Sequence, residues 1–156
     1  MQQKTQNTIG VELIGGEPTL HPSLMHFFDK ACSIPNMQFS ILTNFHKELD
    51  YYLKLIDNYK VRIIPTWHSI PNDKKNVAFQ NKVLSIPKKY FDYVHDGKHW
   101  HNFFIRIMFE KESFECAKEF YLKLVSTIPE YIETSLVADP IPESSTVNLK
   151  TVNYDY

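Results

Sequence analysis

The chain contains 156 residues, of which 22% are charged and 14% aromatic, and its formal net charge at pH 7 is −1. This length supports the core of one domain without disulfide or metal staples, and the composition is globular rather than disordered. No apolar run approaches the roughly 20 residues of a membrane-spanning helix, and the polar residues 1–6 do not resemble a signal peptide. The chain has two cysteines, Cys32 and Cys116, so we expect it to be a reduced, cytoplasmic protein. We expect no association with a membrane, because the sequence lacks a spanning segment.

The charge is unevenly distributed along the chain. Residues 1–106 carry 13 basic and 9 acidic side chains, whereas residues 107–156 carry 4 and 9. The basic excess is densest between Lys74 and Lys98, and we interpret it as a solvated face, which is the usual role of such charge runs. The net charge of the whole chain is close to zero, whereas nucleic-acid-binding proteins are typically basic, so direct binding of nucleic acid is not expected.

In chain order, β-branched runs alternate with stretches of helical periodicity. Residues 10–14 predict a strand that ends at Gly15-Gly16, and a helix follows between Pro22 and Pro35. Its inner stripe is expected to be Leu24, Phe27, Phe28 and Ala31. Residues 39–43 predict a second strand, and a helix with Leu49, Tyr52, Leu53 and Ile56 on one face comes next. A third strand starts at Val61; we expect Pro65 to interrupt its pairing and residues 66–69 to leave towards a loop.

The second half of the chain is less regular at first. Within residues 70–102, only a helix that ends at Pro87 is indicated. Residues 103–109 predict a buried strand, a long helix capped by Ser113 follows, and residues 131–137 form the fifth strand. Helices of crossover length between the strands predict one α/β domain over residues 1–138, with about five mostly parallel strands. The residues from 139 to 156 are expected to form a loosely ordered tail.

The stretch Gly15-Gly16-Glu17-Pro18 carries the strongest chemical signal. Two glycines after a parallel strand allow a tight turn in which backbone groups approach a small polar ligand. The carboxylate of Glu17 could hold a ligand ammonium group, and Pro18 would stiffen the turn. Taken alone, such a glycine pair is more often only a turn than a ligand site.

Gly15-Gly16-Glu17-Pro18 and its continuation to Pro22 resemble the second strand of radical S-adenosylmethionine (SAM) enzymes. Residues 41–44 resemble the third strand of that family, although Phe45 stands where a glycine is common, and residues 64–69 are similar to the end of the fourth. The resemblance covers about residues 9–138 and implies a truncated radical-SAM-like partial barrel. It also implies that Gly15, Gly16 and Glu17 contact the amino group of SAM.

The family's cluster-binding cysteines have no counterpart in this sequence. Radical SAM enzymes hold a [4Fe–4S] cluster with a Cys-x3-Cys-x2-Cys loop after their first strand, and such a cluster requires three thiolates at short spacing. Only nine residues precede the strand at residue 10, and Cys32 and Cys116 lie on predicted helices. We therefore expect the first βα unit to be missing and the chain to be no enzyme on its own, with no resident cofactor.

Two further groups of residues could form binding sites. His95, His99 and His101 have a spacing that could place two ligands of a zinc site on one strand face, although loop histidines are more often solvated. The second group lies in the lysine-rich region, where exposed aromatic side chains would suit a protein interface. The residues expected to bind a partner there are Lys88, Lys89, Tyr90 and Trp100.

The absence of the first βα unit leads to the functional hypothesis. Without a preceding strand, residues 10–14 form an open parallel edge, which residues 1–9, a second copy in a homodimer or a strand of another protein would cover. The leading hypothesis is a non-enzymatic scaffold that binds and inhibits or regulates a protein or protein–nucleic acid complex. By analogy, such a scaffold could be a phage-encoded inhibitor of a nucleic-acid-guided defence nuclease of the host. The alternative is a component of a radical SAM enzyme with a separate cluster-bearing subunit, or a non-radical SAM-binding protein.

Overall fold

The computed structural model describes residues 8–68, 74–91, 93–95, 98–100, 102–109, 113–127 and 132–136. Its main sheet has five strands, which are β1 (Ile9–Leu13), β2 (Met37–Thr43), β3 (Arg62–His68), β6 (Ile105–Phe109) and β7 (Ile132–Leu136). The α-helices are α1 (Leu24–Ala31), α2 (Leu49–Tyr59), α3 (Lys74–Leu84) and α4 (Phe114–Val125). Two 3₁₀ helices, η1 (Pro18–Leu20) and η2 (Lys88–Tyr90), and an antiparallel hairpin of β4 (Tyr93–His95) and β5 (Lys98–Trp100) complete the described elements.

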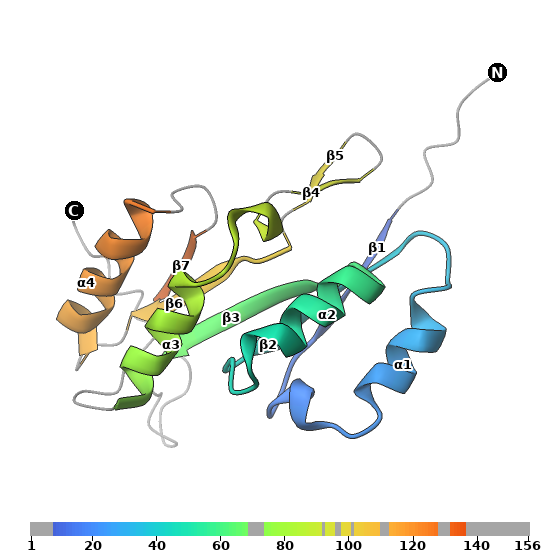
Figure 1. Cartoon of the computed structure of the whole chain (residues 1–156), viewed down its shortest axis with the longest axis horizontal. Coiled ribbons are helices and arrows are strands. Elements are labelled where there is room, and N and C mark those ends of the chain that lie inside the picture. Colours follow the sequence, from blue (N-terminus) through green and yellow to red (C-terminus); the bar gives the residue numbers. More distant parts are fainter. Residues whose placement is uncertain are drawn as a thin grey trace, which may run out of the picture.

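The strands of the main sheet are all parallel and follow one another in the order β1-β2-β3-β6-β7. Each new strand is added on the same side of the preceding one. Right-handed crossovers in such an order bring every connecting helix to the same face of the sheet. Figure 1 shows α1, α2, α3 and α4 together in front of the strands. The predicted α/β fold with about five parallel strands is therefore confirmed.

Alternation along β2 and β3 separates the two faces of the sheet. Phe39 of β2 packs edge-on against Phe27 and Phe28 of α1, and Trp67 of β3 packs against Phe120 of α4. The odd-numbered residues of these strands thus point into the core beneath the helices. The even-numbered residues point to the opposite face, which carries partly exposed polar side chains, Ser40, Arg62 and Thr66 among them.

The expectation for Pro65 was half right. On the side of β3 that faces β6, an isolated bridge joins Ile63 to Phe103, and the run of pairs with β6 starts only at Thr66. Pairing on that side therefore skips Pro65, which has no N–H to donate. Residues 66–68 nevertheless do not leave towards a loop, which corrects the second part of that prediction. They continue β3, and Trp67 is 2% exposed because it fills the space between the sheet and α4.

The predicted inner stripe of the first helix is wrong at one residue. In α1 the buried residues are Leu24, Phe28 and Ala31, whereas Phe27 of the predicted stripe is 39% exposed. In α4 the buried residues are Ala117, Phe120 and Leu124. No described helix combines the length and the apolar character that crossing a bilayer requires. The expected tail at residues 139–156 lies outside the described residues.

Candidate functional site: the carboxyl edge of the sheet and the flank at β1

The glycine pair forms an exposed turn directly after β1. Gly15 has a φ of +92° and Gly16 a φ of +54°, both in the region that disfavours side chains. A Cβ atom built on either residue would meet nothing within 4 Å. The glycines are therefore required by backbone conformation rather than by lack of space, and the region in front of the turn is open.

The next residue, Glu17, ties this turn to the end of β2. Its Oε1 accepts hydrogen bonds from Thr19 Oγ1 at 2.6 Å, Thr43 Oγ1 at 2.7 Å and Thr19 N at 3.2 Å. Its Oε2 accepts one from Asn44 N at 2.7 Å. The carboxylate thus caps η1 and joins the turn after β1 to the end of β2 at the carboxyl edge of the sheet. This role was not predicted from the sequence.

These hydrogen bonds also set the ionisation of Glu17. Burial on its own raises the pKa of a carboxyl group because it disfavours the charged form. Here the bonds from Thr19, Thr43 and Asn44 favour the carboxylate and outweigh that effect, so the pKa of Glu17 lies below its ordinary value. The group is held in its ionised state, with Oε2 accepting a single bond from Asn44 N, which leaves that oxygen a further lone pair.

Phe45 follows this network and adopts a φ of +60°, in the left-handed region. The resemblance described above places a glycine at this position, and glycine adopts such a φ without strain. The ring is 2% exposed and packs on Tyr52, with ring centroids 4.4 Å apart, and on Phe79 and Phe103. Burial of this ring offsets the strain of about 1 kcal/mol expected for a non-glycine residue there.

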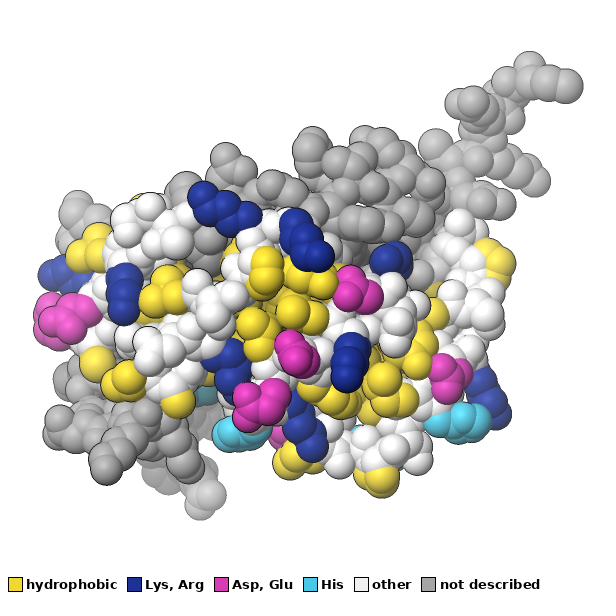
Figure 2. Space-filling model, in the orientation of Figure 1, with side chains coloured by type: hydrophobic (Ala, Val, Ile, Leu, Met, Phe, Trp, Pro, Cys, Tyr) yellow, Lys and Arg dark blue, Asp and Glu magenta, His cyan; other side chains and the backbone are white. Residues whose placement is uncertain are grey.

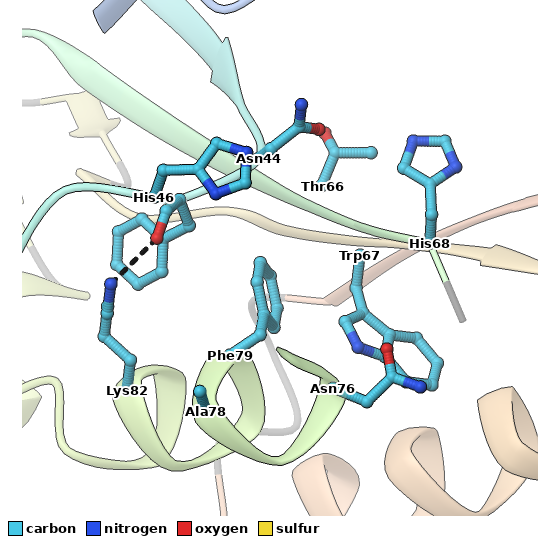
Figure 3. A pocket seen from close by; sticks show the side chains of 10 residues that line it. Asn44, His46, Thr66, Trp67, His68, Asn76, Ala78, Phe79 and Lys82 are labelled. Carbon is cyan, nitrogen blue, oxygen red and sulfur yellow. Dashed lines mark hydrogen bonds between the residues drawn. The ribbon is translucent and has the colours of Figure 1, made fainter. Parts of the chain in front are cut away.

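A cavity of about 400 Å³ opens beside this loop, between the ends of β2 and β3 and the helix α3 (Figure 3). Its polar lining comes from Asn44, His46, Thr66, His68, Asn76 and Lys82. Phe45, Trp67 and Phe79 form aromatic walls. The cavity thus lies at the carboxyl edge of the sheet, beside the ends of two neighbouring parallel strands.

Of the residues predicted to bind a partner, the structure exposes the two lysines and buries the tyrosine. Lys88 and Lys89 are exposed on η2, and the Lys89 ammonium lies 4.8 Å from the centre of the Tyr90 ring. Tyr90 is only 8% exposed, and its hydroxyl donates to Asp57 Oδ2 at 2.9 Å. Tyr90 is therefore a core residue rather than the exposed anchor that was expected. Trp100 belongs to β5, but its side chain lies outside the described part of the structure.

The histidine-rich hairpin gives no described metal site. His95 ends β4 and His99 lies in β5, whereas His101 and the side chains of all three fall outside the described residues. Among the residues that the structure does describe, no group of three or more His, Cys, Asp or Glu could hold a metal ion. Cys32 and Cys116, both partly buried, are free thiols.

A second feature is the apolar flank at β1 and α1, which we define by Ile9, Ile14, Phe27 and Ile34. These side chains are 59%, 64%, 39% and 50% exposed. Two adjoining grooves connect three of them: one runs from Ile14 to Phe27, and the next from Phe27 to Ile34. Figure 2 shows apolar side chains at the surface over α1, with charged ones on either side. In the described chain β1 pairs only with β2, so the flank coincides with an edge of the sheet.

Comparisons with known proteins identify no relative of this chain. No family model matches the chain, and neither the curated proteins nor the solved structures contain a match. The resemblance to radical SAM enzymes therefore rests on residues 15–22, 41–44 and 64–69 alone.

Proposed function

We propose that this chain is a protein-binding module and that its partner docks on the β1–α1 flank. The observation that carries the proposal is the concentration of exposed large apolar side chains there. Of the seven such residues in the described chain, five fall between residues 9 and 34, the four of the flank and Leu20. Isolated exposed apolar residues are ordinary, but a group joined by grooves beside a sheet edge is typical of an interaction surface.

The mode of docking follows from the edge strand. β1 offers a row of backbone N–H and C=O groups on the side away from β2, and the partner supplies a strand that pairs with them. A strand added there brings its own neighbouring side chains over Ile14 and Phe27. Burying these apolar surfaces contributes about 25 cal/mol per Å², and the backbone hydrogen bonds fix the register. A second copy of the chain that uses the same edge is one outcome of the test below.

Matched charge substitutions test this proposal. The flank variant carries Ile14→Glu and Phe27→Glu, and the control variant carries Val77→Glu and Leu122→Glu, where the original side chains are 59% and 57% exposed away from the flank. Each protein is tagged in its native cell, purified with bound proteins and analysed by quantitative mass spectrometry. Sedimentation velocity measures self-association in parallel.

One specific protein, or a dimer, is expected with the wild-type chain and the control variant and should be lost with the flank variant. Association that survives in the flank variant would contradict docking at this surface. So would a wild-type chain that remains a monomer and retains no protein.

A second candidate function is supported by the turn at Gly15 and Gly16. The exposed positive-φ turn, the ionised Glu17 and Asn44 all lie at the carboxyl edge, where the resemblance to radical SAM enzymes implies an amino-group contact. In this version the chain binds SAM, and the protein on the flank supplies the cluster thiolates. Both the SAM contact and the separate cluster-bearing partner are proposals.

A thermal-melt titration with SAM tests the second candidate. Ligand at a hundredfold over its dissociation constant adds about 2.7 kcal/mol to the free energy of unfolding, which is a clear rise in Tm. The rise is expected with wild type and with Lys88→Ala as the control, and it should disappear in Gly16→Val, where a side chain would occupy a φ of +54°. A melting temperature that does not change up to millimolar SAM would exclude this candidate without affecting the flank proposal.

A further inference from the structure

The cavity between the ends of β2 and β3 and the helix α3 is rich in hydrogen-bond donors. None of its described lining residues carries a carboxylate, whereas Lys82, His46 and His68 all line it. Figure 3 shows Lys82 and His46 on one side of Phe79, and Trp67 with Asn76 on the other. A ligand for this cavity needs negative charge at one end and a flat apolar body.

The Lys82 ammonium is the fixed charge of this cavity. Its Nζ donates to Phe45 O at 2.9 Å and to Lys47 O at 2.5 Å, which orients the group at the mouth of the loop after β2. An ammonium has three N–H donors, so one remains for an anion. Burial lowers the pKa of Lys82, and the attraction of Glu48 opposes this effect only in part. A bound anion would restore the pKa by stabilising the charged form.

The apolar part of the cavity is aromatic. The rings of Phe45 and Phe79 meet edge to face with centroids 5.8 Å apart, and the Trp67 indole forms the wall beyond them. The buried Trp67 Nε1 has no acceptor among the described residues, so the lining offers a further donor to a ligand. Aromatic rings pack well in such walls, and a volume of about 400 Å³ is enough for a two-ring molecule.

We propose that this cavity binds a small aryl carboxylate, with its carboxylate next to Lys82 and His46 and its ring between Phe79 and Trp67. The proposal goes beyond partner docking, because the cavity and the β1–α1 flank share no lining residue. It concerns reversible binding and requires no chemical step.

Indole-3-acetate is the probe, and indole-3-acetamide, which has the same shape without the charge, is its control. Binding is followed by two-dimensional ¹H–¹⁵N NMR of the full chain. The acetate should give saturable shifts of the Trp67 indole N–H and of the Phe45 and Phe79 amides. Because a hydrogen bond to a charged group is worth more than one to a neutral group, the amide should bind about tenfold more weakly.

Two variants locate the site. Lys82→Met should reduce the affinity for indole-3-acetate about tenfold, to that of the amide, while Lys88→Met, which removes an exposed lysine elsewhere, should leave it unchanged. Since Lys82 also holds two backbone carbonyls, Ala78→Trp provides a second variant: Ala78 is exposed, lines the cavity and can be enlarged without disturbing the core. It should abolish binding of both probes.

Three results would overturn the proposal. They are equal affinities for the acetate and the amide, the absence of saturable binding to the wild-type chain, and binding that Ala78→Trp does not change. The folded state of every variant is checked in the same NMR spectra, so a loss of binding cannot be confused with a loss of structure.

Discussion

The centre of the sheet and its β1 edge bury their large side chains to very different extents. Phe28 is 0% exposed and its neighbour Phe27 is 39% exposed, although both lie on α1. Tyr52 and Phe45, beside the ends of β2 and β3, are almost completely buried, whereas Ile14, at the end of β1, is 64% exposed. β2 and β3 each have a strand on both sides, and β1 has one neighbour in the described chain.

This difference indicates that the side chains of the centre stabilise the fold, whereas those of the flank do not. In the centre, apolar side chains and a closed polar network hold the strand ends together, so substitutions there should affect stability. At the flank, apolar side chains face solvent and contribute little to stability, so their presence there favours binding. Four substitutions test this division, in order of decreasing expected effect.

The largest effect is expected from Phe45→Ala. Removing a buried ring that contacts Tyr52, Phe79 and Phe103 should cost about 3–5 kcal/mol, because it loses apolar burial and leaves a cavity. Phe27→Ala, in the flank, should cost about 1 kcal/mol or less. Urea unfolding of both variants measures the difference. Equal costs would contradict the division into two regions.

A smaller effect is expected from Thr43→Val, which keeps the shape and removes the hydroxyl. Thr43 Oγ1 donates to Glu17 Oε1, accepts from Phe45 N at 3.0 Å and lies 3.2 Å from Tyr52 Oη. Leaving such buried groups unpaired should cost about 1–3 kcal/mol. Ser40→Ala, on the partly exposed face of the same strand, is the control and should change the free energy of unfolding by less than about 0.5 kcal/mol.

Acid should weaken the same network through Glu17. Its pKa is lower in the folded state, so its contribution to stability is complete above the ordinary value of 4.5 and is lost as the pH falls below it. Unfolding free energies measured from pH 6 to pH 3 should therefore fall less steeply in Glu17→Gln than in wild type. Parallel curves for the two proteins would show that Glu17 does not carry this dependence.

The smallest effect on stability is expected from Ile14→Glu. Its side chain is 64% exposed, so the free energy of unfolding should change by no more than about 0.5 kcal/mol in a urea titration. The same variant should nevertheless lose partner binding. A large loss of stability would mean that Ile14 is covered in solution and would remove the flank from consideration as a docking surface.

Sequence patterns predicted the strands well, because period-2 alternation and glycine or proline boundaries are local signals. The strand at residues 39–43 appears within β2 (Met37–Thr43), and the one at 103–109 overlaps β6 (Ile105–Phe109). The continuation of β3 through Pro65 was missed because the ring removes one donor on one side only, and the pairing with β2 does not depend on it. The hairpin of β4 and β5 was missed as well, since its strands have three residues each.

The candidate sites were harder to foresee, because they depend on contacts between distant residues. The role of Glu17 as a clamp requires Thr43 and Asn44, which lie 26 and 27 positions further along the chain. Tyr90 is buried through its bond to Asp57, 33 positions away. The cavity near Lys82 combines three separate segments. Phe27 was assigned to the inner stripe of α1 together with Leu24, Phe28 and Ala31, since helical periodicity identifies a stripe but not the width of it that is covered.

The consecutive strand order has a consequence for the way the sheet opens. No strand is inserted between two earlier ones, so each βα unit is held mainly by the units next to it in the chain. Local opening of β1 and α1 would break the pairing of β1 with β2 and leave the pairing of β2 with β3 in place. Backbone amides of β1 should accordingly exchange with heavy water sooner than those of β3, and a protein bound at that edge would slow this exchange.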